Sequence, residues 1–384
     1  MKTTTRTSES TAMSTCLLLA FELGERIWKL GFTTGFGQRP RIREIPTGAV
    51  DRLLEEIARA KTKLDLAANT AVISCYEAGR EGFWLHRFLV AHDITNFVVD
   101  SSSIEVNRKA RRAKSDRLDL GGLLTLLARY RQGDERAWHV VRVPSEEDED
   151  ARHPHRTWET VQQDRSRAIN RIKGLLVTMG LRLQLDKEFL GRLEGARRWN
   201  GKPIPDGMKQ RLTREWELLN VLDAQLEELE TARTAAKPDP QTPTGKCVIT
   251  LQTLRAIGPV GAWMLATEIF GWREIHNGRE LGALIGVVPS PFQSSETSHE
   301  QGISRAGNKH VRRLMVQLAW SWLHYQPQSG LSQWYRTKFG GGSRRLRRIG
   351  IVALARKLLI ALWRYVETGT VPDGALLKPH PVAA

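Results

Sequence analysis

The sequence predicts an α/β domain followed by a longer, mainly helical part. Short β-rich runs alternate with amphipathic helical stretches from residue 16 to residue 130, and from about residue 157 the pattern becomes long and helical. Residues 237–245 carry three prolines and a glycine, which end a helix and mark a boundary. A chain of 384 residues is long enough for two domains of ordinary size.

In the first third, Gly and Pro residues and hydrophobic periodicity set the limits of each element. Strands are predicted at 16–23, 26–34, 41–45, 71–76 and 96–99, and helices at 48–65, 81–91 and 115–130. The order of elements is therefore β β β α β α β α. By analogy, this is the order of the ribonuclease H-like fold, in which the first and fourth strands lie side by side in the middle of a mixed sheet.

The middle of the chain has an apolar seam at steps of three and four residues, formed by Leu212, Trp216, Leu219, Leu222, Leu226 and Leu229. This spacing predicts a coiled coil or a long antiparallel hairpin, packed against the chain's own helix at 157–180 or against a second copy. The acidic run 145–151 is read as a solvated linker or a helix start. We predict a disordered lead 1–14, a catalytic domain 15–145, a helical coiled-coil region 146–236, a linker 237–246, a C-terminal domain 247–370 and a tail 371–384.

The charge balance favours an anionic partner, because 58 Lys and Arg stand against 42 Asp and Glu, for a net charge of +16. Nucleic acid is the first candidate and an acidic membrane the second. The longest apolar stretch, 349–365, is interrupted by Arg356, Lys357 and Arg364, so no membrane segment is expected. Three widely spaced cysteines indicate neither a disulfide framework nor a zinc cluster and fit a reducing cytoplasm.

Four acidic residues fall where the predicted topology would gather them. Asp116 and Asp119 are three residues apart at a predicted helix start, a pattern that on its own usually reflects the helix dipole and solvation. Glu22 ends the first strand and Glu77 ends the fourth, so the third helix could bring its two acids over the same edge. Four clustered carboxylates repel one another unless cations neutralise them, and two Mg²⁺ ions would do so while supporting phosphoryl transfer.

Two motifs carry a family resemblance. The runs 75–79 (CYEAG) and 114–119 (KSDRLD) resemble the DEDD-type insertion-sequence transposases, Piv/MooV-like, whose catalytic half has a Holliday-junction-resolvase-like (RuvC-like) ribonuclease H fold. The resemblance implies Mg²⁺-binding roles, with Mn²⁺ as an alternative ion, for Glu77, Asp116, Asp119 and the acid of the first strand. That acid is usually aspartate in the family and is Glu22 here, which moves the carboxylate by about 1.5 Å.

Basic and glycine residues around these motifs predict phosphate contacts. Positive charge beside the acids is concentrated in Arg108, Lys109, Arg111, Arg112 and Lys114, which alone would be read as a solvated loop. Residues 254–262 resemble a helix-hairpin-helix element, in which Gly258 and Gly261 would let backbone amides approach a phosphate. The alternative for the two glycines is an ordinary helical turn.

Residues 284–289, 292–308 and 311–314 resemble the C-terminal domain of the same family. The resemblance implies a serine nucleophile that joins covalently to a DNA phosphate, which falls on Ser295, with Ser294 as the alternative because Glu296 replaces the family's usual glycine. The residues placed after it to hold phosphates are Arg305, Asn308, Lys309, Arg312 and Arg313. The four arginines of 343–348 fit the same role or a flexible tether.

These observations predict a DNA transposase of the bacterial cytoplasm and nucleoid, which excises and inserts an insertion sequence. The resemblance implies a structured guide RNA encoded by the element and a homo-oligomer, dimer or tetramer, assembled on DNA. Two alternatives remain open. One is a catalytically altered nucleic-acid-binding relative, suggested by Glu22 and Glu296. The other is a structure-selective junction nuclease, which would need the four acids and not the serine.

Overall fold

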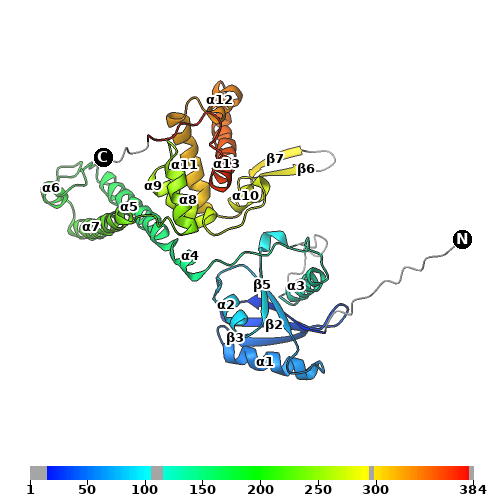
Figure 1. The fold of residues 1–384 in the computed structure, drawn as a ribbon. Helices are drawn as coiled ribbons and strands as arrows, with labels where there is room; N and C mark the ends of the chain where they lie inside the picture. Colours follow the sequence, from blue (N-terminus) through cyan, green and yellow to red (C-terminus); the bar gives the residue numbers. More distant parts are fainter. Residues whose placement is uncertain (1–14, 105–115, 294–297, 380–384) are drawn as a thin grey trace. The chain divides into compact units, whose positions relative to one another are not determined.

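The computed structural model describes residues 15–104, 116–293 and 298–379, and the chain divides into two compact units (Figure 1). The first unit is Met1–Val143 and the second is Pro144–Ala384. The predicted disordered lead 1–14 lies outside the described residues. In the part of the chain that the structure describes, no helix is long and apolar enough to cross a membrane.

The first unit is built on a five-stranded mixed sheet with the strand order β3-β2-β1-β4-β5. β1 runs antiparallel to β2 and parallel to β4, and β4 runs parallel to β5. The strands are β1 (Leu17–Leu23), β2 (Ile27–Thr33), β3 (Arg41–Pro46), β4 (Val72–Glu77) and β5 (Thr95–Val99). The predicted succession of elements is confirmed, and the first and fourth strands are neighbours as expected.

Helices cover both faces of this sheet: α1 (Val50–Lys63) and α2 (Trp84–Ala91) on one, and α3 (Asp116–Arg131) on the other. Because successive strand residues point to opposite faces, the apolar run of β1 serves two cores. Leu17, Leu19 and Phe21 pack with α1 and α2, whereas Leu18 and Ala20 pack with α3.

The direction of α3 follows from its contacts with the sheet. A Cβ on Gly31 of β2 would lie 3.1 Å from the Leu124 side chain and 3.6 Å from Leu120 Cβ, so glycine allows the helix to lie close at this point. Gly31 pairs with Ala20, the middle residue of β1, so Leu120 and Leu124 lie over the middle of the sheet. At the other end of the helix, the charge of Arg131 acts on Cys16, just before β1 begins. The helix therefore runs opposite to β1 and begins near the carboxyl ends of the parallel strands.

The second unit opens with a helical hairpin. α5 (His153–Val177) and α7 (Asp206–Ala235) pack along each other, preceded by α4 (Glu146–Asp150) and joined through α6 (Phe189–Gly195). The predicted seam is buried between them, with Leu212 and Leu219 at 0% and 2% exposure beside Ala168 and Ile172 of α5. Within the chain, the seam packs against the chain's own helix α5, and contact with a second copy stays a prediction.

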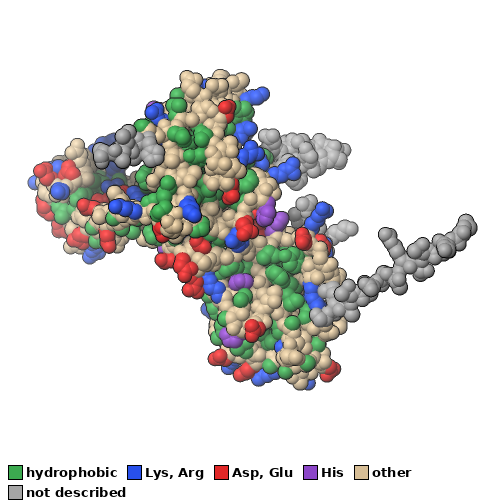
Figure 2. All heavy atoms as spheres, in the orientation of Figure 1, with side chains coloured by type: hydrophobic (Ala, Val, Ile, Leu, Met, Phe, Trp, Pro, Cys, Tyr) green, Lys and Arg blue, Asp and Glu red, His purple; other side chains and the backbone are tan. Residues whose placement is uncertain are grey.

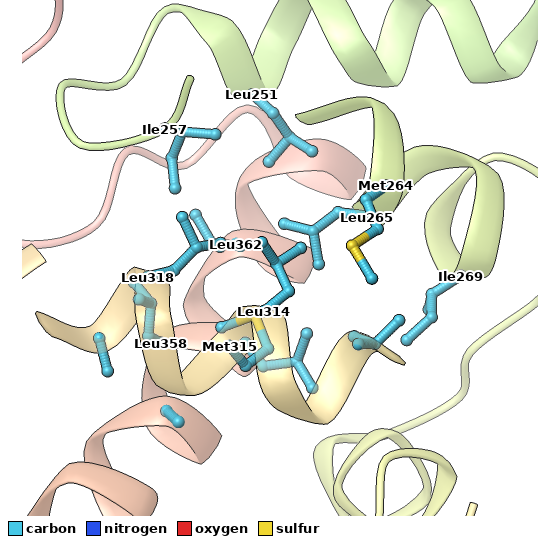
Figure 3. Close-up of a cluster of buried hydrophobic side chains, with 14 of the residues drawn as sticks. Leu251, Ile257, Met264, Leu265, Ile269, Leu314, Met315, Leu318, Leu358 and Leu362 are labelled. Carbon is cyan, nitrogen blue, oxygen red and sulfur yellow. The ribbon is translucent and has the colours of Figure 1, made fainter. Parts of the chain in front are cut away.

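A helical domain completes the second unit. Its helices are α8 (Pro243–Gln252), α9 (Pro259–Leu265), α10 (Gly278–Leu284), α11 (Lys309–Tyr325), α12 (Gly330–Tyr335) and α13 (Arg344–Thr368), with π-helical turns at Ala266–Phe270 and Arg336–Gly340. A two-stranded sheet, β6 (Pro289–Gln293) and β7 (Ser298–Ile303), projects between α10 and α11. Figure 3 shows the apolar side chains that unite these helices, among them Leu251, Met264, Leu314 and Leu362.

Two boundaries differ from the predicted ones. α8 begins at Pro243, inside the predicted linker, because proline is favourable in a first helical turn and the Thr242 hydroxyl caps it by accepting from Gly245 N. In the predicted tail 371–384, Leu377 pairs with Leu254, and the amide of Leu376 donates to Gln326 Oε1 at 2.7 Å. The first part of this segment is therefore fixed to the helical domain.

Candidate active site

Two of the predicted acids lie next to each other at one edge of the sheet. Phe21 of β1 pairs with Tyr76 of β4, so the following residues, Glu22 and Glu77, are neighbours on adjacent parallel strands. Such strands are about 4.8 Å apart. Glu22 shares the parity of Ala20 and Glu77 that of Cys75, and both of these pack with α3, so the two glutamates belong to the face that α3 covers.

The other two acids belong to the first turn of α3. The backbone of Asp116 and Asp119 is helical, while their side chains lie outside the described residues. Since α3 begins near the carboxyl ends of β1 and β4, its first turn is at the same edge of the sheet as Glu22 and Glu77. The topology thus brings the backbone of all four predicted acids to one end of the first unit.

Asp100 is an acid at this edge that the sequence reading missed. Val99 of β5 pairs with Glu77, and Asp100 follows directly, half-buried. Its amide donates to His139 O at 2.9 Å and its carbonyl accepts from Ser103 Oγ at 2.7 Å, so its backbone is held at the strand end. The sequence did contain a signal for this residue: Asp100 directly follows a predicted strand. If that strand runs parallel to the Glu77 strand, the acid after it lies at the same edge of the sheet.

The charge of Glu77 reaches the core below this edge. Burial and then the charge of Glu77 raise the pKa of the Cys75 thiol two residues earlier on β4, so this cysteine is a neutral core residue. Among the side chains that the structure describes, no group of three His, Cys, Asp or Glu residues is close enough to hold a metal ion. That comparison does not include the carboxylates of Asp116 and Asp119.

Several predicted binding residues lie outside the described part of the chain. Both serines considered as nucleophiles, Ser294 and Ser295, fall between β6 and β7 in the segment 294–297. The predicted phosphate-binding cations of the first unit all fall in the segment 105–115, namely Arg108, Lys109, Arg111, Arg112 and Lys114. Their roles stay predictions.

The two glycines of the helix-hairpin-helix-like element differ in their surroundings. Gly258 precedes α9, is exposed, and has no atom within 4 Å of the position that a Cβ would take. Gly261 is buried, and a Cβ there would lie 3.4 Å from the Leu318 side chain of α11. Gly258 therefore leaves a helix start open to solvent, whereas Gly261 allows two helices to pack.

Asn308 is held inside the second unit. Its side-chain oxygen accepts from the amides of His310 and Val311 at 3.0 and 3.1 Å, which caps α11. Its Nδ2 donates at 2.7 Å to Glu268, which is only 2% exposed. Arg156 of α5 donates to the same carboxylate through Nε at 2.8 Å and Nη2 at 2.9 Å.

A second buried carboxylate, Glu159 of α5, faces the first turns of α11. It is 7% exposed, forms a short hydrogen bond with His310 Nδ1, and lies 3.5 Å from an Nη of Arg313. Arg312 is bound through backbone oxygens, since its Nη1 donates to Ile285 O at 2.8 Å. Of the predicted cations in this segment, Arg305 and Lys309 are the exposed ones without a described side-chain partner.

These contacts fix the segment that leaves β7. Arg305 has a positive φ of 57° and its amide donates to Gly286 O at 3.1 Å, while Asn308 N donates to Leu284 O at 2.8 Å. The base of the β6–β7 hairpin is thereby joined to the end of α10. The two ends of the hairpin are therefore held by backbone hydrogen bonds.

Comparison with known proteins identifies the class as transposase. The chain is 35% identical over 375 residues, 94% of each chain, to y4rJ of Sinorhizobium fredii, which carries a transposase name. It is 29% identical over 236 residues to the transposase for insertion sequence element IS1328 of Yersinia enterocolitica, covering 61% of this chain and 67% of the relative. Residues 249–336 match the sequence model of the Transposase IS116/IS110/IS902 family. The chain belongs to this family of enzymes, which cut and rejoin DNA.

Proposed function

We propose that this transposase moves an insertion sequence with a four-carboxylate metal site together with a serine nucleophile. The acids of the first unit bind divalent metal ions, and Ser295, with Ser294 as the alternative, attacks a DNA phosphate. The observation that carries the proposal is the parallel pairing of β1 and β4, with α3 running opposite to them. In this topology, Glu22 and Glu77 lie at the carboxyl ends of two adjacent parallel strands. The first turn of α3, which carries the other two acids, begins at the same edge of the sheet. The topology also supports assigning the first unit to the DEDD-type, ribonuclease H-like (RuvC-like) fold.

The donor chemistry of this edge fits Mg²⁺. Glu22, Glu77, Asp116 and Asp119 offer carboxylate oxygens, which hard cations prefer, and none of the four is a His or Cys. Bound there, Mg²⁺ would neutralise the clustered charge and polarise a phosphate. The residues of the chain hold the ions and orient the DNA strand, and exposed Arg305 and Lys309 are available for its phosphates.

The metal assignment is tested by Asp116→Asn and Asp119→Asn. Each substitution keeps side-chain size and removes one charge, so excision of the element in cells should stop while binding of the purified protein to the element ends persists. Asp93→Asn, an exposed aspartate between α2 and β5, is the matched control and should excise normally. Normal excision by the Asp116→Asn variant would refute the metal-binding role of Asp116.

The serine separates transposition from simple cleavage. Ser295→Ala should abolish the covalent protein–DNA adduct detected after denaturation, and Ser294→Ala should retain it. If both single variants and the double variant still release free DNA ends, the protein acts as a junction nuclease instead.

The substitution of Glu22 for the family's usual aspartate motivates the alternative of a catalytically altered binding protein. For an active enzyme, Glu22→Gln should abolish excision and Glu22→Asp should retain it. A protein that binds DNA and never excises, whichever residue stands at 22, would fit the binding-only alternative.

We further propose a guide RNA and a homo-oligomer as partners. Support comes from the family membership and from the net charge of +16. The test is to purify the protein from cells carrying the element, sequence the retained RNA, and measure the mass of the assembly by light scattering. Retained RNA that maps to the element supports the guide, and an equal yield from unrelated transcripts refutes it.

A further inference from the structure

In one long stretch of the second unit, every formally charged side chain is positive. Residues 301–366 contain thirteen Lys and Arg and no Asp or Glu. Part of this charge is used inside the protein: Arg312 binds backbone oxygens, Arg313 faces Glu159, and Lys357 lies over the Trp334 ring. Arg336 likewise donates to Pro327 O at 2.9 Å, and the exposed cations without such partners mark where the unit presents free positive charge.

The largest such group is at the start of α13. Arg344, Arg345, Arg347 and Arg348 are all exposed, and none forms an ion pair or a side-chain hydrogen bond with another described residue. In Figure 2, Lys and Arg side chains lie over the part of the domain that carries α12 and α13. We name these four residues the α13 arginine cluster.

The α13 arginine cluster lies on the first two turns of α13, whose side chains are exposed although Tyr335 Oη donates to the carbonyl of Arg347 at 3.2 Å. Gly350 is the first buried residue of α13, because Phe339 packs there within 2.5 Å of where a Cβ would be. Residues 344–349 precede this contact, a length of about 9 Å at the rise of an α-helix. Leu346 and Ile349 on the same turns are 41% and 52% exposed. The side chains of this end are thus available to a partner.

The arginines stand at the helix end where they stabilise the fold least. The start of a helix has a partial positive charge, so acidic residues are favourable there and cations are not. α13 begins with four cations, no acid in its first turn, and Ser343 as its cap. Helix stability does not account for this arrangement. The helix dipole and the four guanidinium groups together favour an external anion.

We propose that the α13 arginine cluster binds the two sugar-phosphate backbones that border the major groove of duplex DNA. At 100° per residue, the four arginines cover an arc of about 160°, so they reach to both sides of the helix end. A B-form major groove of about 12 Å admits an α-helix, whereas the deep, narrow major groove of A-form RNA does not. The inference rests on the proposed function only in taking DNA as the substrate.

The test is the salt dependence of binding to a DNA duplex, measured by fluorescence anisotropy with a chelator present so that no strand is cut. Each phosphate contact contributes about 0.9 to the slope of log K against log salt. Replacing all four arginines by Gln should lower the slope by about 3 to 4. Between 50 and 200 mM salt, the factor by which affinity falls should therefore be roughly 100 times smaller for the variant than for the native protein.

A matched control removes the same charge elsewhere. Arg182, Lys187, Arg197 and Lys202 are exposed, lack described side-chain partners, and lie in the connection between α5 and α7. Their fourfold replacement by Gln should change the slope by less than about 1. The melting temperature of the α13 variant should equal or exceed that of the native protein, since repulsion with the helix dipole is removed.

An unchanged slope for the α13 variant, or an equal decrease in the control variant, overturns the proposal. So does an equal loss of affinity for an RNA duplex of the same sequence, because the groove argument then fails. Binding in the chelator is independent of catalysis. Failure of the carboxylate or serine assignment therefore leaves this result intact, and a negative result here leaves those assignments standing.

Discussion

Removing the carboxylate of Glu268 should destabilise the second unit more than removing any exposed one. Glu268 is 2% exposed and accepts three hydrogen bonds, two from Arg156 and one from Asn308. Breaking a buried ion pair on one side costs about 3–5 kcal/mol, because the remaining charge stays in the protein. The Arg156 side chain is 38% exposed and can regain water, so we expect about 3 kcal/mol for Glu268→Ala. Glu268→Gln, which keeps an acceptor for Asn308, should cost about 2 kcal/mol.

Differential scanning calorimetry measures this effect. For a folding unit of this size, 1 kcal/mol corresponds to about 2–4 °C, so Glu268→Ala should lower the melting temperature of the second unit by roughly 6–12 °C. Glu188 is the control: its side chain is 84% exposed and pairs with Arg192 at 3.2 Å. An exposed pair contributes at most about 1 kcal/mol. The reasoning is refuted if Glu268→Ala melts no lower than Glu188→Ala.

The same carboxylate predicts a pH dependence. Burial raises the pKa of Glu268, but the hydrogen bonds and charge of Arg156, with Asn308 and Arg152, outweigh it and hold the pKa below its ordinary value. A carboxyl whose pKa is lowered by folding contributes its stabilisation above the unfolded pKa, and this is lost as pH falls through the folded pKa. The difference in urea midpoint between native protein and Glu268→Gln should therefore be largest at neutral pH and shrink below about pH 4.5. A difference that stays constant from pH 7 to pH 4 would contradict this.

Three further predictions test the packing. Gly286 and Gly302 both have a positive φ, of 66° and 84°, but a Cβ on Gly286 would lie 1.9 Å from a backbone oxygen, whereas one on Gly302 would meet nothing within 4 Å. Measured by urea unfolding, G286A should therefore lower the free energy of unfolding by more than about 3 kcal/mol, and G302A by about 1–2 kcal/mol. In the α5–α7 hairpin, Leu219→Ala should cost about 2–5 kcal/mol and its 43% exposed neighbour Leu218→Ala less than about 0.5, whereas equal values would indicate that the seam is not buried. Burial raises the pKa of Cys247 to about 12, and all three cysteines are buried free thiols, so a thiol-specific disulfide reagent should label none within minutes at pH 8 until denaturant is added.

Local sequence signals were sufficient for the first unit. The strand β1 is a continuous apolar run because both of its faces are covered, and Gly24 and Pro40 lie in the loops that bound the next strand. Once the order of elements was known, the parallel pairing of β1 and β4 placed Glu22 beside Glu77. Asp100 was missed because the reading used acids only on strands one and four, although the end of β5 follows the same rule.

Local signals failed in the second unit because the partners are remote in sequence. The carboxylate that holds Asn308 belongs to Glu268, 40 residues earlier, and the one that faces His310 belongs to Glu159, 151 residues earlier. No local sequence pattern distinguishes either glutamate, because a buried acid in a helix has the same kind of neighbours in sequence as an exposed one. The predicted hairpin partner of α7 was left open for the same reason, since one apolar seam fits two different helices equally.

The pairing of individual cations, rather than their number, shows which of them remain free for the proposed contacts with DNA. Asn308, Arg312 and Arg313 were grouped with Arg305 and Lys309 because all five follow the predicted serine in one stretch of sequence. In the folded unit the first three have partners near the base of the β6–β7 hairpin, so replacing them would disturb this base as well as any phosphate contact. Substitution of Arg305 or Lys309 changes charge alone. A loss of DNA binding in Arg313→Gln is therefore evidence about phosphates only if the melting temperature is unchanged, whereas in Lys309→Gln it is direct evidence.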